Sequence, residues 1–211
     1  MPDQHSTLRA QRRIETQRTV QAHAVRLFTE RGYDATTVTD VARAAGVSPM
    51  TVYRHFPTKE DLVLFEPHGH LVAERIAASS PAQPLVRRIG RALVDSAAVM
   101  TGGDRGGGRT ASEQFLLARL RLMISTPALR AKHLDSQYAL QQAVVEGLGD
   151  EAADAETVFR ARAAASACLG AMHTALVHWA EDDGRSALPD LIARALTAAF
   201  GEVMTGGTSD T

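Results

Sequence analysis

The chain has 211 residues, of which 45% are hydrophobic and 22% charged, a composition typical of a globular protein rather than a disordered or collagen-like one. The most apolar stretch, residues 115–124, is interrupted by two arginines and falls short of the roughly 20 apolar residues that a membrane-spanning helix needs, so we exclude a membrane protein. The single cysteine, Cys168, cannot close an intramolecular disulfide and no apolar leader is visible, so we expect a protein of the reducing cytoplasm.

The formal net charge of −1 taken alone argues against binding to an anionic polymer, but it is unevenly distributed. The first 60 residues contain nine basic and six acidic side chains, a charge of +3, and the remainder carries −4. Because phosphate contacts need local cations only, this asymmetry is a weak indication of a nucleic-acid-facing N-terminal end. Residues 1–13, with Arg9, Arg12 and Arg13, are expected to form a flexible basic arm that either reaches a minor groove or is simply solvated.

The first predicted helix spans residues 14–31, because its apolar residues recur at helical spacing from Val20 and Gly32 follows its last turn. A second begins with the capping-box-like pair Thr37 and Asp40 and ends at Gly46.

A third predicted helix opens at Ser48-Pro49 and ends before Pro57. Two helices this short, joined by a glycine-containing turn, match a helix-turn-helix unit and must be packed on a support. The residues expected on or near its outer surface are Met50, Thr51, Tyr53, Arg54 and His55. Hydroxyl and backbone N–H groups suit phosphate, and Arg54 suits guanine edges or backbone. The alternative is a helical hairpin that only packs.

A fourth helix is predicted from the Thr58 cap toward Ser79, with Lys59 in its first turn. A cation there opposes the helix dipole by about 0.3–1 kcal/mol unless an anion such as a DNA phosphate lies nearby. Pro67 is expected to kink or break this helix.

The break is rich in metal-ligating side chains, namely Glu66, His68, His70 and Glu74. The two histidines lie two residues apart rather than the helical three or four, so we favour a coincidental polar kink and predict no metal.

The rest of the chain also has helical periodicity, over residues 85–100, 112–125, 128–148, 154–182 and 188–204. The glycine-rich segment 102–109 lacks the lysine and preceding strand of a phosphate-binding loop and is interpreted as a plain loop. No alternating strand pattern is seen, so the predicted fold class is all-α.

The residues from the first helix to the fourth resemble the N-terminal domain of the TetR family of bacterial transcriptional repressors. The motifs that carry the resemblance are Gly32-Tyr33-Asp34, Thr36-Thr37-Val38, Val41-Ala42, Ala45-Gly46-Val47-Ser48, Thr51-Val52-Tyr53-Arg54-His55-Phe56 and Thr58-Lys59-Glu60-Asp61-Leu62. The block covers about residues 14–62 and is specific as a whole. The break at Pro67 departs from the family, in which the fourth helix links the two domains.

The resemblance implies a homodimer with an N-terminal three-helix DNA-binding domain and a C-terminal helical domain that binds a small molecule and dimerises. We therefore expect an arm at 1–13, the DNA-binding domain at 14–62, the ligand-binding and dimerisation domain at 63–204 and a flexible tail at 205–211. Residues that would contact mainly phosphate are Thr37, Ser48, Thr51, Tyr53, His55 and Lys59, whereas Met50 and Arg54 would face bases or backbone.

In the C-terminal part, the predicted helix 154–182 is rich in small residues, which permits close approach of another helix: Ala161, Ala163, Ala164, Ala165, Ser166, Ala167, Gly170, Ala171 and Ala175. With the amphipathic helix that follows, it fits a dimer bundle, or alternatively only the subunit core. Pocket walls combine apolar bulk with a few polar groups, so the candidate ligand-binding residues are Met100, Phe115, Arg119, Met123, Tyr138, Met172, His173 and Trp179.

The predicted function is a ligand-responsive repressor that binds a palindromic DNA operator as a dimer and is released by a small-molecule effector. An enzyme is the first alternative, but Cys168 lies in an alanine-rich helix without a neighbouring base, and no hydrolase, zinc-protease or dinucleotide motif is present. A helical interaction module that does not bind DNA is the second alternative. We predict no catalytic residue and no cofactor.

Overall fold

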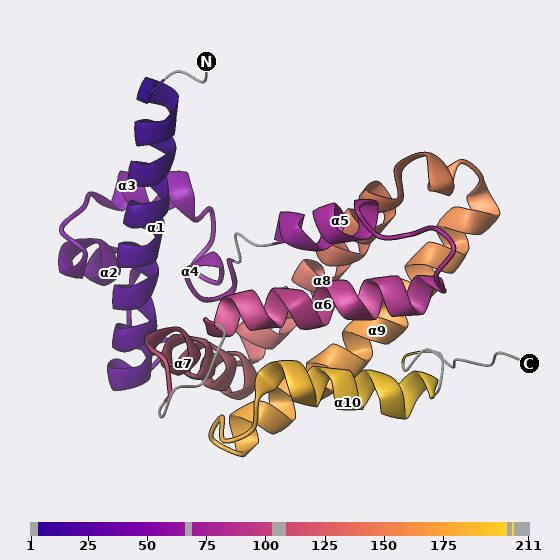
Figure 1. Cartoon of the computed structure of the whole chain (residues 1–211). Helices are drawn as coiled ribbons and strands as arrows, with labels where there is room; N and C mark the ends of the chain where they lie inside the picture. Colours follow the sequence, from indigo (N-terminus) through magenta and orange to yellow (C-terminus); the bar gives the residue numbers. More distant parts are fainter. Residues whose placement is uncertain (1–3, 66–68, 103–108, 202–203, 205–211) are drawn as a thin grey trace, which may run out of the picture. The chain divides into compact units, whose positions relative to one another are not determined.

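The computed structural model describes residues 4–65, 69–102, 109–201 and 204, and every regular element in this part of the chain is helical (Figure 1). The helices are α1 (Gln4–Arg31), α2 (Val38–Ala44), α3 (Pro49–His55), α4 (Asp61–Leu64), α5 (Gly69–Ala77), α6 (Leu85–Thr101), α7 (Ala111–Ser125), α8 (Pro127–Leu148), a 3₁₀ turn η1 (Gly149–Ala152), α9 (Ala155–Glu181) and α10 (Leu188–Phe200). The predicted all-α fold class is confirmed.

Helix boundaries follow the local signals of the sequence, apart from the starts of α1 and α4 and the end of α10. Helix α1 begins at Gln4 rather than residue 14, so residues 4–13 are helical where a flexible arm was expected. This extension contains no glycine or proline and is rich in good helix formers, so nothing in it stops the helix. Helix α10 ends at Phe200, before residue 204, because Gly201 follows it with a φ of +61°.

The predicted break before Pro67 is confirmed, since α4 ends at Leu64 and α5 begins only at Gly69. Residues 66–68 themselves lie outside the described part of the chain, as does most of the glycine-rich segment 102–109. The side chain of His70 also lies outside the described part of the chain, as do Glu66 and His68 of the same predicted polar kink.

The chain divides into two compact units, residues 1–65 with 121–132 and residues 66–120 with 133–211. The expected domain boundary at 62/63 lies close to the first division. Residues 121–132, which are the end of α7 and the start of α8, group with the N-terminal residues. Nothing in the sequence pattern predicts this grouping.

In the N-terminal unit, α1 is the support on which α2, α3 and α4 are assembled. Helix α1 contacts α2 and α4, and α2 contacts α3 (Figure 1). Phe28 from α1 and Phe56 from the end of α3 are almost fully buried. The Gln21 side-chain amide donates to the carbonyl oxygen of Phe65 at 3.0 Å, which ties the end of α4 to α1. These contacts explain how helices of four to seven residues persist.

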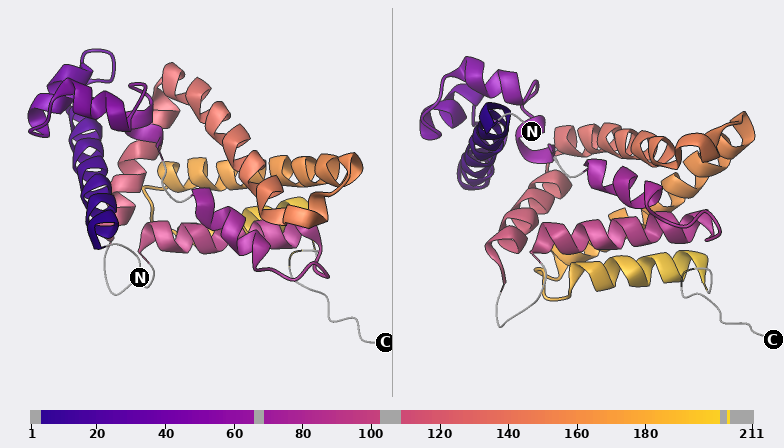
Figure 2. Two further views of the ribbon diagram at one scale, coloured as in Figure 1. Left: turned by 90° about the horizontal axis from the view of Figure 1, so that it is seen from above. Right: turned by 45° about the horizontal axis from the view of Figure 1, so that its top comes forward.

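The C-terminal unit is a layered helical bundle in which α6 lies between α5 and α10, with α9 packed against both α6 and α10 (Figure 2). Its core contains Ile89, Leu93, Ile192 and Leu196. Trp179 is also fully buried, and its indole N–H donates to the carbonyl oxygen of Ser186 at 2.9 Å.

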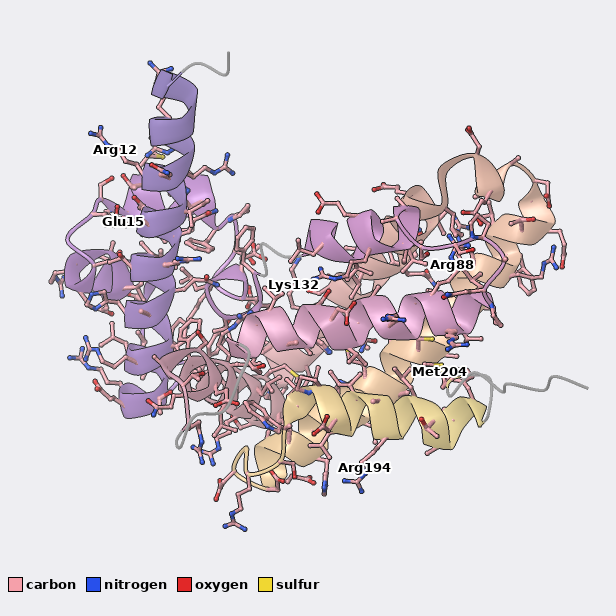
Figure 3. All side chains as sticks on the ribbon, viewed as in Figure 1. Arg12, Glu15, Arg88, Lys132, Arg194 and Met204 are labelled. Atoms are coloured by element: carbon pink, nitrogen blue, oxygen red, sulfur yellow. The ribbon has the colours of Figure 1, made fainter. Side chains whose placement is uncertain are left out.

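A buried arginine joins three segments of this unit (Figure 3). The guanidinium of Arg88 donates two hydrogen bonds to the Glu151 carboxylate, at 2.6 and 2.8 Å, and a third, from Nε, to Ser79 Oγ at 2.7 Å. It also donates to the carbonyl oxygen of Ile76 at 3.2 Å. Arg88 therefore connects the end of α5, helix α6 and the η1 turn, and its charge is compensated by a bidentate carboxylate.

Candidate nucleic-acid interface

Helices α2 and α3 each begin with a side-chain cap, which in α2 is reciprocal. The predicted capping box is confirmed: Thr37 Oγ1 accepts from the Asp40 N–H at 3.1 Å, and the Thr37 N–H donates to the Asp40 carboxylate at 3.0 Å. These bonds to Thr37 hold the pKa of Asp40 below its ordinary value. Ser48 Oγ accepts from the Thr51 N–H at 3.1 Å and begins α3 in the same way.

The outward face of α3 carries the side chains that the sequence indicates for DNA. Met50 and Tyr53 are 77% and 50% exposed, and Arg54 is exposed beside them. Val52, between them in sequence, is fully buried and anchors the helix to the rest of the unit. An exposed hydroxyl and guanidinium on a helix fixed from behind can reach phosphate oxygens and base edges without rearrangement.

The hydroxyl groups at the start of α3 keep donor capacity. Ser48 Oγ and Thr51 Oγ1 are 2.9 Å apart and share one hydrogen bond. Two hydroxyl groups contribute two hydrogens, and the shared bond uses one of them. One hydroxyl hydrogen at this turn therefore remains for an external acceptor.

His55, at the end of α3, is half-buried, and its Nδ1 is the one buried side-chain polar atom in the described residues without a hydrogen-bond partner. Burial lowers the pKa of His55, and the charges of Arg54 and Arg13 lower it further. The same Arg13 belongs to the exposed basic end of α1, from which Arg12 also projects (Figure 3). An anion at this position would meet two guanidinium groups and an imidazole.

Lys59 occupies a different environment from the one expected. Helix α4 begins at Asp61, so Lys59 precedes its first turn. Its ammonium donates to the carbonyl oxygen of Tyr33 at 2.6 Å and lies over the Tyr33 ring, 4.2 Å from the centroid. The argument from an unfavourable helix dipole is therefore wrong, because this cation is stabilised inside the unit. A phosphate contact from Lys59 remains a prediction without that support.

Tyr33 and Glu60 complete this connection. The Tyr33 hydroxyl donates to Glu60 Oε1 at 2.7 Å, and burial together with this bond raises the pKa of Tyr33. This bond fixes the Gly32-Tyr33 link after α1 to the start of α4. The sequence pattern does not predict the contact, because the two residues are 27 positions apart.

The eight candidate ligand-binding residues differ in burial, and a shared pocket remains a prediction. Met123 groups with the N-terminal unit, Tyr138 is 62% exposed, and Trp179 is fully buried. Met100, Phe115, Arg119 and Met172 are half-buried, with the Arg119 guanidinium 5.7 Å from the centre of the Phe115 ring.

His173 is hydrogen-bonded, as a core histidine would be, but to a second histidine. Its Nδ1 lies 3.2 Å from Nε2 of His133 on α8, and Gln137 approaches the same atom. His133 and Gln137 have the i, i+4 spacing of one helix face, which is the only sequence signal that pairs them.

A groove of about 650 Å³ lies along the outer surface of α9 and α10. It is lined by Thr174, Ala175, His178, Leu191, Ala193, Arg194, Ala195, Thr197 and Ala198. Along the same side of α9, Ala163, Ala167 and Gly170 are exposed. The small-residue pattern therefore has a solvent-facing side as well as a side in the subunit core, where Ala161 and Ala165 are buried.

Cys168, the residue on which an enzymatic alternative depended, is fully buried. Its thiol points to the carbonyl oxygen of Val86 at 3.7 Å, and burial raises its pKa to about 12. A thiol in this state is not a nucleophile at neutral pH. No helix in the described residues is both long and apolar enough to cross a bilayer.

Two family models match the chain. The model of the bacterial regulatory proteins of the tetR family matches residues 22–64, which contain α2 and α3. The model of the MftR C-terminal domain, also a TetR-type domain, matches residues 106–202. The two matches together span more than half of the chain.

Among curated proteins, the putative mycofactocin biosynthesis transcriptional regulator MftR of Mycobacterium tuberculosis is 24% identical over 202 residues, 96% of each chain. The HTH-type transcriptional regulator TcmR of Streptomyces glaucescens is 31% identical over 112 residues, which cover 53% of this chain and 49% of that protein.

Solved structures share the fold. The fatty acid degradation regulator FadR of Bacillus halodurans superposes with a TM-score of 0.56 at 21% identity, over 88% of this chain and 95% of that one. FadR of Bacillus subtilis in complex with stearoyl-CoA has a TM-score of 0.53 at 20% identity, over 87% and 97% of the two chains.

Proposed function

The chain belongs to the TetR family of bacterial regulatory proteins, and from this premise we propose that it is a repressor that binds a palindromic operator as a homodimer and is released by a small-molecule effector. Its relatives are transcriptional regulators. We place its action in the cytoplasm, where duplex DNA is available to it. The N-terminal unit would read the operator, and the C-terminal unit would dimerise and sense.

The observation that carries the DNA-binding role is the exposed face of α3. Met50, Tyr53 and Arg54 are solvent-facing on a helix whose cap and buried Val52 leave it little freedom. We propose that Tyr53, Thr37, Ser48, Thr51 and His55 contact phosphate and that Met50 and Arg54 reach base edges in the major groove. The basic end of α1, being helical, would follow the DNA backbone rather than enter the minor groove as a flexible arm.

The groove on α9 and α10 supports the dimer. Its lining is dominated by alanines and threonines, and the exposed Ala163, Ala167 and Gly170 extend the same small-residue surface along α9. Small side chains let a second pair of helices approach closely, so two copies would form a four-helix interface around a two-fold axis. Such an axis matches a palindromic operator.

For the effector we propose a fatty acyl-CoA thioester as the first class to test. The proposal is supported by two FadR proteins of the same fold, that of Bacillus subtilis in complex with stearoyl-CoA and that of Thermus thermophilus in complex with lauroyl-CoA. The half-buried Met100, Phe115 and Met172 remain candidates for contacts with an acyl chain. Addition of the thioester should then release the protein from DNA.

The test is equilibrium binding of the full chain to fluorescent duplexes from its own promoter region, titrated with salt. We expect the affinity to fall by at least about a hundredfold between about 50 and 200 mM salt, because phosphate contacts release counterions. Tyr53→Phe should weaken binding to all duplexes by about 0.5–1.5 kcal/mol, and Arg54→Ala should cost about 1–3 kcal/mol with altered base preference.

Arg91→Ala is the matched control, since Arg91 is an exposed arginine on α6 in the C-terminal unit and its loss changes the net charge equally. Absence of binding to any promoter duplex at low salt, or an equal loss in Arg54→Ala and Arg91→Ala, contradicts the proposed interface.

A further inference from the structure

Three polar side chains converge between α8 and α9 in the C-terminal unit. Nε2 of His133 and Nδ1 of His173 are 3.2 Å apart, with ring centroids 5.2 Å apart and ring planes tilted by 32°. The side-chain amide nitrogen of Gln137 lies 3.3 Å from the same Nε2. All three side chains are half-buried. We call them the His133–Gln137–His173 cluster.

The cluster is not a complete hydrogen-bond network for two neutral imidazoles. A neutral imidazole nitrogen offers either one hydrogen or one lone pair. His133 Nε2 is within reach of two partners, so His173 and Gln137 compete for a single lone pair or a single hydrogen. His173 and Gln137 therefore cannot both complete a hydrogen bond with this nitrogen.

A metal ion bound by both imidazole nitrogens fits this geometry. Zinc binds imidazole nitrogens at about 2.0–2.1 Å, so two such nitrogens on one tetrahedral ion lie about 3.3–3.4 Å apart. The observed separation of 3.2 Å needs a shift of only about 0.1–0.2 Å to match. Turning the Gln137 amide by 180°, which exchanges nitrogen and oxygen, would present a carbonyl oxygen as a third ligand.

The backbone prepares this arrangement. His133 and Gln137 are one turn apart on α8 and share a face. One turn further, the Gln141 amide donates to the carbonyl oxygen of Arg162 at 3.0 Å and to Ser166 Oγ at 2.5 Å, which fixes α8 against α9. The donor atoms are therefore held close together before any ion arrives, which reduces the ordering cost of binding.

We propose that the His133–Gln137–His173 cluster binds one divalent transition-metal ion, with Zn²⁺ as the probe, through two imidazole nitrogens and one amide oxygen. Imidazole-rich sets of this kind suit zinc, nickel and copper. A fourth position is left for water or another small ligand. The bound ion would cross-link α8 to α9, a role independent of the DNA-binding activity.

The test is titration of the metal-free full chain with Zn²⁺ by calorimetry and with Co²⁺ by visible absorption, whose intensity reports tetrahedral coordination. We expect one ion per chain, a tetrahedral Co²⁺ spectrum and a rise of several degrees in the unfolding midpoint with excess Zn²⁺. His133→Gln and His173→Gln should each weaken binding by at least about tenfold and remove the Co²⁺ spectrum.

Two controls separate this cluster from other histidines. His23→Gln alters a half-buried histidine on α1 outside the cluster, and a His68→Gln/His70→Gln double variant removes the pair near the break after α4. Both should bind like the unmodified chain. Binding that survives both single cluster variants, binding lost in either control, or no one-to-one binding at all would overturn the proposal. Operator affinity of the metal-free chain measures the proposed DNA-binding function separately.

Discussion

The exposed face of α3 and the His133–Gln137–His173 cluster are assembled by contacts of very different range. At α3, the bond that orients Ser48 and Thr51 spans three residues. In the cluster, His133 and His173 are 40 residues apart and meet only because α8 and α9 pack against each other. A surface built from local bonds tolerates changes elsewhere in the chain, whereas a site built across two helices depends on the whole unit.

The proposed dimer surface gives the largest expected effect. Gly170 is exposed and an added Cβ meets nothing within 4 Å, so Gly170→Arg should leave the fold of the subunit intact. In a two-fold interface it would bury two unpaired guanidinium groups and raise the dimer dissociation constant by at least about a thousandfold. Light scattering and operator binding measure the change, with Arg162→Lys, an exposed substitution that keeps its charge, as the control. A Gly170→Arg protein that stays dimeric would place the interface elsewhere.

Arg88 should give the next largest effect, confined to the C-terminal unit. Arg88→Ala removes four hydrogen bonds, two of them to the Glu151 carboxylate, together with a buried side chain, which we expect to lower the free energy of unfolding by about 2–4 kcal/mol. Urea unfolding gives the magnitude, and hydrogen exchange shows where it acts. Hydrogen exchange in α2 and α3 should be unchanged. Hydrogen exchange that is accelerated equally in both units would contradict the view that α3 is held by local contacts, independently of the C-terminal unit.

Ser48→Ala should have a smaller effect, concentrated in α3. It removes the cap of the helix, a loss of about 1 kcal/mol, and should accelerate hydrogen exchange in α3 and weaken DNA binding. Ser112→Ala is a suitable control, because Ser112 is exposed on α7 and does not cap it. If the loss in Ser48→Ala spreads to α9 and α10, the two regions are not independent.

Acidification should give the smallest change, with a different pH window for each of two groups, His55 and Glu151. The folded-state pKa of His55 lies below 6.5, so the unfolded chain binds more protons, and this contribution to stability is lost as pH falls through about 6.5. The pKa of Glu151 is lowered by hydrogen bonds from Arg88, so its contribution is present above 4.5 and is lost as pH falls through the lower folded value.

Stability measured against pH checks both signs. His55→Gln should flatten the profile between about pH 7 and 5.5, and Glu151→Gln should flatten it below about pH 5. If His55→Gln flattens the profile below about pH 5 and Glu151→Gln flattens it between about pH 7 and 5.5, the causes given for the two pKa shifts are wrong.

The range of the contacts also explains what the sequence could and could not predict. The caps at Thr37 and Ser48, the end of α4 before Pro67 and the exposure of Met50, Tyr53 and Arg54 follow from neighbouring residues, and the structure agrees with them. The position of Lys59 did not follow, because its partner Tyr33 is 26 residues away.

In the C-terminal unit, helical periodicity located the helices but not the sites. A half-buried methionine, a core tryptophan and a ligand-contacting aromatic residue have the same pattern, so periodicity does not separate them, and Trp179, a candidate pocket residue, is fully buried. His133 and Gln137 were missed because nothing in the local sequence distinguishes an i, i+4 polar pair that faces another helix from one that faces solvent.

The burial of Trp179 also provides an optical reporter. It is the only tryptophan in the chain, and its indole is enclosed by Gly184 and fixed to the Ser186 carbonyl, so its emission comes from one defined environment. Trp179 lies at the end of α9, next in sequence to His178 of the groove. Changes in its fluorescence would therefore report dimerisation or effector binding in the C-terminal unit. DNA contacts at α3 would not change this fluorescence.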